Sequence, residues 1–273
     1  MKNIIGLGLW GCEIASCFEQ FSSYSVYKLG SDVESGPNCH HIPHEEQIEK
    51  YEENLPQVDF LKDLEGEVLL ILSGIDKESA AAFAVLEQVK HTKLNILYVK
   101  NDMSFASEPL KLLDNLIIKV FSESARSGMF DKVFVVSTEI VENFLSDLTI
   151  LNFKSQISSL IANTMMQIIF FMNSKSAYGK VHELPIGARL FTIGVLGEDE
   201  EENLFFPLDN ITDVQYYVAC NRERLEKDKD FFKEVKNTMK RKTEKDFRVS
   251  FGIYEQNQVD KATYCLATTS VIA

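Results

Sequence analysis

The chain opens with Asn3-Ile4-Ile5-Gly6-Leu7-Gly8-Leu9-Trp10-Gly11, and this stretch decides the fold. The apolar run at residues 2–6 predicts a buried strand, and residues 12–21 after the glycines are predicted to be helical. A strand, a glycine-rich loop and a helix in this order are typical of the opening of a nucleotide-binding α/β fold. We therefore expect a Rossmann-like, parallel-sheet lobe at the start of the chain.

The next segments continue this alternation of strands and helices. Four further apolar runs predict strands, at residues 24–29, 68–72, 94–99 and 133–136. Residues 78–91 and 106–124 have helical periodicity. Such alternation predicts an α/β class with a parallel sheet that helices cover on both faces.

The pattern changes after residue 152. Residues 153–173 carry apolar side chains at the i, i+3, i+4 spacing of one helix face, which predicts a long, mostly buried helix. Strands are then predicted at residues 189–196, 214–219, 247–254 and 261–268, together with one charged helix at 222–242. We expect a smaller α+β lobe.

Two charged segments of this second lobe are interpreted as solvated. Gly197–Asn203 is predicted to be an acidic turn. The helix at 222–242 is predicted to face water with its lysines and glutamates and to pack through Leu225, Phe232, Val235 and Met239.

Composition narrows the classes of function. The net charge is −13, with acidic clusters at Glu45–Glu53 and Glu198–Glu202, so direct binding of nucleic acid is not expected. The five cysteines are scattered, which is typical of reduced thiols in a cytoplasmic protein. No signal peptide or membrane span is predicted, because no apolar run reaches 18 residues.

Several stretches carry a resemblance to a known family. Residues 248–253 read Arg-Val-Ser-Phe-Gly-Ile, and residues 262–268, after a short acidic turn, read Ala-Thr-Tyr-Cys-Leu-Ala-Thr. This resembles the closing hairpin of FtsZ, in which a strand ending in Phe-Gly precedes one ending in Ala-Thr. The strand Asp131–Val136 with Glu139–Phe144 is similar to the strand before the family's base-contacting helix, and residues 153–154 to the start of that helix. Arg189–Gly197 resembles the strand that opens its second lobe.

The resemblance to the tubulin and FtsZ family implies an organisation into three parts. Residues 1–152 would form a Rossmann-like GTPase-type domain, residues 153–180 the central helix and its connection, and residues 181–273 an α+β C-terminal domain. It also implies that GTP is the nucleotide, with Gly6, Gly8 and Gly11 near its phosphates. The alternative is that these glycines bind no phosphate and only permit a close approach of strand and helix.

The family's second phosphate loop corresponds to Ser73-Gly74-Ile75-Asp76-Lys77-Glu78-Ser79. By resemblance, Ser73, Gly74 and Ser79 are the residues that would contact a nucleotide. Asp76 and Glu78 place negative charge where a triphosphate needs donors. Binding of GTP is therefore expected to be lost or weakened.

Hydrolysis of GTP is not expected either, and no catalytic residue is proposed. In the family, a loop after the central helix inserts acidic residues into the nucleotide pocket of the next subunit. The corresponding residues here are Ser174-Lys175-Ser176-Ala177-Tyr178-Gly179-Lys180, which include no carboxylate.

Two other kinds of site compete with this interpretation. The segment Cys39–Glu46 gathers Cys, His and Glu side chains, but its spacing matches no zinc pattern, so a polar surface loop is favoured over a metal site. The glycines at 6–11 with Asp32 about 20 residues further on also resemble the NAD-binding loop of dehydrogenases. The sequence offers no catalytic Lys/His pair for such an enzyme.

The sequence thus predicts a divergent protein similar to tubulin and FtsZ that acts by self-association or by binding a protein partner. It would serve a phage, plasmid or cell-division system. The alternatives are a small enzyme that uses NAD or another nucleotide, and a structural subunit that keeps only the fold.

Overall fold

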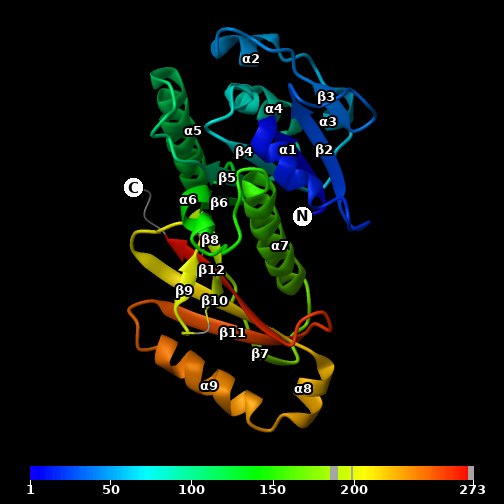
Figure 1. The fold of residues 1–273 in the computed structure, drawn as a ribbon. Helices are drawn as coiled ribbons and strands as arrows, with labels where there is room; N and C mark the ends of the chain where they lie inside the picture. Colours follow the sequence, from blue (N-terminus) through cyan, green and yellow to red (C-terminus); the bar gives the residue numbers. More distant parts are fainter. Residues whose placement is uncertain (185–189, 198, 270–273) are drawn as a thin grey trace. The chain divides into compact units, whose positions relative to one another are not determined.

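The computed structural model describes residues 1–184, 190–197 and 199–269. The chain forms two compact units, residues 1–163 and residues 164–273, which we call unit 1 and unit 2 and describe separately (Figure 1). The strand predicted at 189–196 is described from Leu190, and residue 189 lies outside the described residues.

Unit 1 is built on a parallel sheet of the order β3-β2-β1-β4-β5-β6. Its strands are β1 Asn3–Leu7, β2 Ser25–Gly30, β3 Cys39–His41, β4 Glu67–Ser73, β5 Lys93–Lys100 and β6 Lys132–Ser137. Residues 68–72 of the central strand β4 are fully buried on both faces, as expected for a parallel sheet between helices. The predicted parallel α/β lobe is confirmed.

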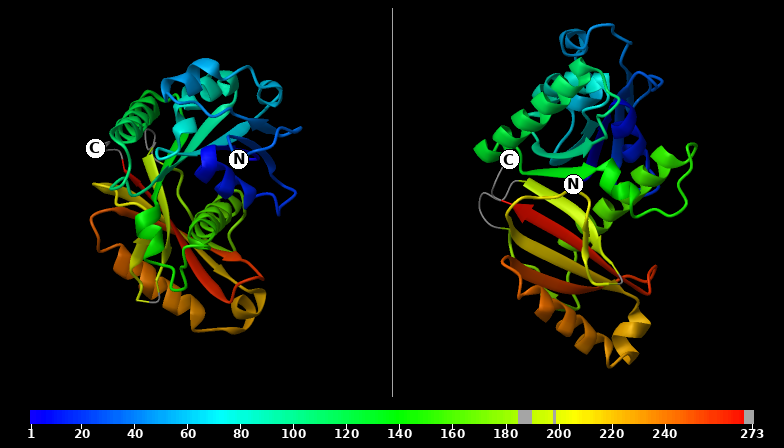
Figure 2. Two further views of the ribbon diagram at one scale, coloured as in Figure 1. Left: turned by 45° about the horizontal axis from the view of Figure 1, so that its top comes forward. Right: turned by 60° about the vertical axis from the view of Figure 1, so that its left-hand side comes forward.

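Helices cover both faces of this sheet. They are α1 Gly8–Ser16, α2 Glu49–Asn54, α3 Asp59–Lys62, the 3₁₀ helix η1 Lys77–Ala81, α4 Ala82–Val89, α5 Glu108–Ser127 and α6 Thr138–Glu142. Figure 2 shows α1 on one face and α4 and α5 on the other. The helix predicted at 12–21 begins earlier and ends earlier, because Gly8 with φ 73° turns the chain directly from β1 into α1.

The long helix is present as predicted. Helix α7 runs from Phe153 to Met172, beginning in unit 1 and ending in unit 2. Among the described residues, no helix is both long enough and apolar enough to cross a membrane.

Unit 2 carries a mixed sheet of the order β8-β12-β10-β11-β7, with β9 paired to β8. Its strands are β7 Tyr178–Lys180, β8 Leu190–Leu196, β9 Glu202–Leu204, β10 Ile211–Cys220, β11 Arg248–Glu255 and β12 Lys261–Thr269. The predicted closing hairpin is wrong, because β11 and β12 pair on opposite sides of β10. Strand β10 is buried on both faces over residues 213–220, which favours the central position that it takes between them.

The helix predicted at 222–242 is two helices, α8 Arg222–Lys227 and α9 Phe231–Lys242. Asp228 ends the first and starts the second, since its Oδ1 accepts hydrogen bonds from the amides of Asp230 (3.1 Å) and Phe231 (2.9 Å). The new helix start after Asp228 determines which side chains of α9 are buried. Phe231 is 3% exposed and Phe232 is 37% exposed, so the prediction of Phe232 as a core residue is wrong.

The predicted solvated turn at 197–203 is also wrong at one residue. The Glu202 carboxylate is mostly buried and pairs with Lys242 (3.0 Å) and Lys245 (2.6 Å). It also accepts a hydrogen bond from the Tyr216 hydroxyl (2.5 Å). The buried ammonium of Lys242 requires such a partner, and this explains why Glu202 is drawn inward.

Candidate functional site

The predicted phosphate-loop glycines lie where β1 passes into α1, and two of them are confined by backbone. A Cβ added to Gly6 would lie 2.5 Å from the carbonyl oxygen of Gly11. A Cβ added to Gly11 would lie 2.3 Å from the carbonyl oxygen of Ile71 in β4. At Gly6 and Gly11, therefore, the absence of a side chain permits β1, α1 and β4 to pack closely.

Gly8 faces a side chain from the second predicted loop. A Cβ added to Gly8 would lie 2.8 Å from Cβ and 2.9 Å from Oδ2 of Asp76. The same Oδ2 accepts a hydrogen bond of 2.8 Å from the backbone N–H of Trp10. The structure thus brings the two predicted loops together through Asp76.

Asp76 occupies the N-terminal end of α1, where the free amides of a helix favour an anion. Its side chain is only 7% exposed. Burial raises the pKa of Asp76 to about 7, against the lowering effect of the Trp10 amide, while the neighbouring charge of Glu78 raises it further. Near neutral pH this internal carboxyl group is therefore close to its titration midpoint.

The remaining predicted contacts of the second loop point into unit 1 itself. The Ser73 hydroxyl donates to the side-chain oxygen of Asn101, and the Ser79 hydroxyl donates to the carbonyl oxygen of Ser73 (2.5 Å). At Gly74, an added Cβ would lie 2.3 Å from the Tyr98 hydroxyl and 2.3 Å from Oδ1 of Asp114. These groups hold the loop in place, and both hydroxyls donate to other groups of unit 1.

A second buried carboxylate ties this loop to the end of β2. Glu78 accepts a hydrogen bond from the Ser31 hydroxyl and a longer one, 3.4 Å, from the Ser31 amide. Asp76 therefore accepts from an amide of α1, and Glu78 accepts from the hydroxyl and the amide of Ser31.

Next to α1 lies an open cleft of about 330 Å³. Its lining consists of Gly8, Leu9, Cys12, Glu13, Ser16, Lys28, Gly30, Ser31, Asp32, Val33, Glu34, Cys39 and Lys154. Of these, the sequence singled out Gly8, Cys39 and Asp32 as possible ligand contacts and missed Lys28, while Lys154 was compared only with the start of the family's base-contacting helix. The two lysines are far from the glycine loop in sequence, and both also pair with carboxylates, Lys28 with Glu19 (2.7 Å) and Lys154 with Glu13 (3.8 Å).

The Cys12 thiol of this cleft is a poor nucleophile. Burial raises the pKa of the Cys12 thiol to about 12. In the described part of the chain, no group of three or more Cys, His, Asp or Glu side chains could hold a metal ion, and this includes the Cys39–Glu46 segment.

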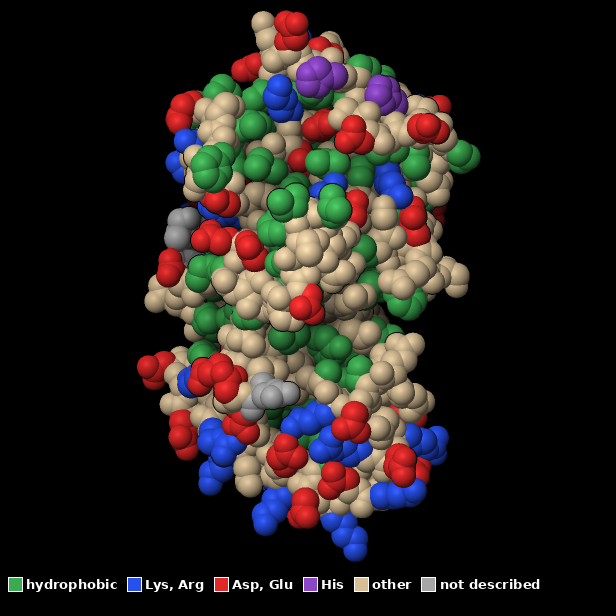
Figure 3. Space-filling model, in the orientation of Figure 1, with side chains coloured by type: hydrophobic (Ala, Val, Ile, Leu, Met, Phe, Trp, Pro, Cys, Tyr) green, Lys and Arg blue, Asp and Glu red, His purple; other side chains and the backbone are tan. Residues whose placement is uncertain are grey.

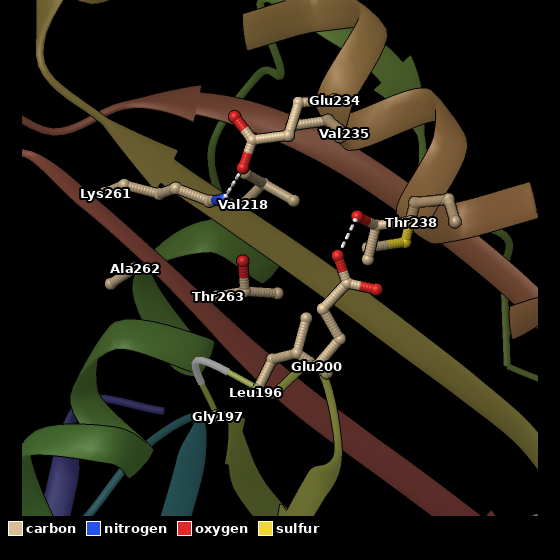
Figure 4. Close-up of a pocket in the computed structure, with 11 residues that line it drawn as sticks. Leu196, Gly197, Glu200, Val218, Glu234, Val235, Thr238, Lys261, Ala262 and Thr263 are labelled. Atoms are coloured by element: carbon tan, nitrogen blue, oxygen red, sulfur yellow. Dashed lines mark hydrogen bonds and ion pairs between the residues drawn. The ribbon is translucent and has the colours of Figure 1, made fainter. Parts of the chain in front are cut away.

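Unit 2 has a separate hollow of about 280 Å³ between α9 and its sheet (Figure 4). Each charged side chain around it has a partner. Lys261 binds Glu234, and Glu200 accepts a hydrogen bond of 2.9 Å from Thr238. These contacts fasten α9 and the turn before β9 to the sheet.

The sequence matches no protein-family model and no curated protein. Solved structures do match over the whole chain, at low identity. The FtsZ of M. jannaschii, an empty dimer, has a TM-score of 0.70 at 10% identity, covering 98% of this chain and 87% of its own. TubZ of Bacillus thuringiensis serovar israelensis, in a GTPγS-form protofilament, has a TM-score of 0.72 at 13% identity, covering 100% and 89%.

A third similar structure is CetZ1 from Haloferax volcanii, a GDP-bound monomer. It has a TM-score of 0.68 at 14% identity and covers 100% of this chain and 95% of its own. Helical models of TubZ-Bt filaments with two and four strands also match. The chain therefore has a tubulin/FtsZ-like fold.

Proposed function

We propose that this chain, with the fold of FtsZ and TubZ, is a self-assembling protein in which GTP binding and hydrolysis are lost or weakened. Similar solved structures include a dimer, a protofilament and helical filaments, which supports self-association. The loss or weakening of GTP binding is inferred from the position of the Asp76 carboxylate at the start of α1.

The physical argument concerns competition for one set of donors. A nucleotide phosphate binds a helix N-terminus through backbone amides and the helix dipole. Here the Trp10 amide already donates to Asp76, and Gly8 is in contact with the same side chain. A phosphate would have to displace a carboxyl oxygen that is covalently part of the loop and therefore present at high effective concentration.

The charge around the cleft next to α1 also opposes binding of a triphosphate. The carboxylates of Glu13, Asp32 and Glu34 line the cleft, against the ammonium groups of Lys28 and Lys154. A triphosphate needs an excess of donors and positive charge, and this lining does not supply it. The segment 174–180, which follows the long helix, contains no carboxylate, so a neighbouring subunit would bring no acidic group from this loop for hydrolysis.

The contact of Asp76 with the Trp10 amide also weakens the alternative of an NAD-dependent enzyme. Asp32 does line the cleft, as a ribose-binding acid would. The pyrophosphate of NAD, however, would need the α1 amides that Asp76 uses.

The test combines binding of labelled GTP with sedimentation of the purified chain at several concentrations, and uses NADH as a parallel ligand. We expect pelleting that rises with protein concentration and is unchanged by GTP, without saturable binding of either nucleotide. Asp76→Gly removes the internal anion and should increase GTP binding, whereas Asp76→Asn keeps an oxygen at the Trp10 amide and should not. Saturable GTP binding by the natural chain, with pelleting only in its presence, would refute the proposal. Binding of NADH alone would favour the enzyme.

A further inference from the structure

One face of α9 carries a row of three exposed lysines. Lys233, Lys236 and Lys240 are spaced i, i+3 and i+7 in α9, so they share one helix face, and all three are exposed. None forms an ion pair with another described residue. We call these three residues the lysine stripe.

Most basic side chains around the stripe have a carboxylate partner, although Lys229, just before α9, also forms no ion pair with a described residue. Arg222, Arg224, Lys227, Arg241 and Lys245 each have a carboxylate partner within unit 2. In a chain with a net charge of −13, these three lysines are a local basic feature of unit 2, around which Figure 3 shows Lys and Arg side chains interspersed with Asp and Glu side chains.

Two exposed aromatic rings lie beside the stripe. Phe232 and Tyr178 are 37% and 49% exposed, and their ring centroids are 4.4 Å apart in an edge-to-face arrangement. The ammonium of Lys236 lies 5.4 Å from the centroid of the Phe232 ring. Aromatic side chains are enriched at protein interfaces, and these two rings are exposed beside lysines that form no ion pair with a described residue.

Unit 1 carries the complementary charge. Residues 1–163 contain 24 Asp and Glu and 13 Lys and Arg, and so hold −11 of the net charge of −13. Glu46, Glu49 and Glu52, in α2 and the turn before it, are exposed and form no ion pair with a described residue. We call these three residues the acidic patch.

We propose that the lysine stripe, with Phe232 and Tyr178, docks onto the acidic patch of a second copy of this chain. The inference rests on the proposed self-association and names its contact. Because the two surfaces differ, each copy can offer one to the copy ahead and the other to the copy behind. A contact between two different surfaces can be repeated from copy to copy. If the rotation between successive copies does not close a ring, the repeated contact builds a filament.

Charge reversal in both surfaces tests this contact. One variant carries Lys233→Glu, Lys236→Glu and Lys240→Glu, and the other carries Glu46→Lys, Glu49→Lys and Glu52→Lys. Each alone should reduce pelleting on the order of tenfold, because like charges then face each other across the contact. An equimolar mixture of the two should pellet again, since every stripe then meets a patch of opposite sign.

A net-charge control separates this effect from general repulsion. Lys62→Glu, Lys90→Glu and Lys119→Glu make the net charge more negative by the same amount as stripe reversal does, at exposed positions of unit 1. We expect this control to pellet as the natural chain does. Circular dichroism and thermal unfolding should show that every variant keeps its fold, because all the substituted side chains are exposed.

The outcomes are distinct for the two proposals. Pelleting of the natural chain with no effect of stripe reversal, or without rescue in the mixture, would overturn this contact and leave self-assembly standing. A natural chain that stays monomeric at every concentration would overturn both. Loss of binding to phosphatidylserine vesicles on stripe reversal, with unchanged pelleting, would assign the stripe to an anionic membrane surface instead.

Discussion

At the scale of single residues, Asp76 links the candidate site to stability. Its pKa in the folded chain, about 7, is above the ordinary value of 3.8. Between these pH values the folded state keeps a proton that the unfolded state has lost, so the contribution of Asp76 to stability falls as pH rises through this window. The whole difference corresponds to at most about 4 kcal/mol.

We therefore predict that Asp76→Asn stabilises the chain at pH 8 by about 2 to 4 kcal/mol relative to the natural protein, and much less at pH 4. Asn keeps a side-chain oxygen for the Trp10 amide but cannot ionise. Urea unfolding at a series of pH values measures the difference between the two proteins, in which the other carboxylates cancel. A variant that is less stable at pH 8 would mean that the ionised carboxylate is instead favoured in the fold.

Gly11 allows a second residue-scale prediction. Gly11→Ala would place a methyl group 2.3 Å from the Ile71 carbonyl oxygen, and backbone atoms on both sides leave little room to adjust. We expect a loss of about 2 to 3 kcal/mol or more in the free energy of unfolding. Gly36→Ala is the matched control, because nothing lies within 4 Å of its added Cβ. Equal urea midpoints for the two variants would contradict the close approach of α1 and β4.

The sequence anticipates this site only in part. The glycines after an apolar strand predict the β1–α1 turn, and the acidic residues at 76 and 78 predict a poor place for phosphate. The contact between Asp76 and the Trp10 amide could not be predicted, because it joins residues 66 positions apart through the pairing of β1 with β4. Local periodicity carries no information about such pairing.

At the scale of elements, helix α9 shows how one capping residue sets a whole packing face. The apolar residues at 225, 232, 235 and 239 fit a continuous helix over 222–242, which is why the sequence favoured Phe232 as a core residue. The Asp228 side chain interrupts that helix and moves burial to Phe231. An Asp two or three residues before an aromatic pair is a capping signal that could have been found.

This difference gives a prediction about two adjacent aromatic residues. Phe231→Ala removes a buried ring and should cost about 3 to 5 kcal/mol in the free energy of unfolding. Phe232→Ala removes a ring that is largely at the surface and should cost less than about 1 kcal/mol. Thermal or urea unfolding of the two variants measures this contrast. If Phe232→Ala were the more destabilising substitution, the continuous helix predicted from the sequence would be correct.

At the scale of the whole molecule, the sequence is most informative where patterns are long. Buried runs such as 68–72 and 94–99 fix the parallel sheet of unit 1, and the apolar face of 153–173 fixes α7. The net charge can also be counted from the sequence. The sequence does not show which charged side chains pair with one another and which stay available at the surface. Pairing of Arg241 with Glu200 and of Lys245 with Glu202 removes some lysines and arginines from the available charge and leaves the stripe on α9.

This distribution of charge predicts the sign of the salt effect on assembly. Two copies that each carry −13 repel one another as whole molecules, so general association would increase when salt screens that repulsion. Docking of the lysine stripe on the acidic patch is an attraction between exposed charges and weakens with the same screening. We predict that pelleting falls as NaCl rises from about 50 mM to about 500 mM, a range in which the Debye length drops from about 14 Å to about 4 Å.

The stripe-reversal variant with Lys233→Glu, Lys236→Glu and Lys240→Glu supplies the internal comparison for this measurement. Its residual pelleting should rise with salt, because only repulsion then remains to be screened. Opposite slopes for the two proteins in one sedimentation series would place the salt-sensitive attraction on α9. A natural chain that pellets more as salt rises would instead mean that apolar contacts drive assembly, with Phe232 and Tyr178 as the first residues to substitute.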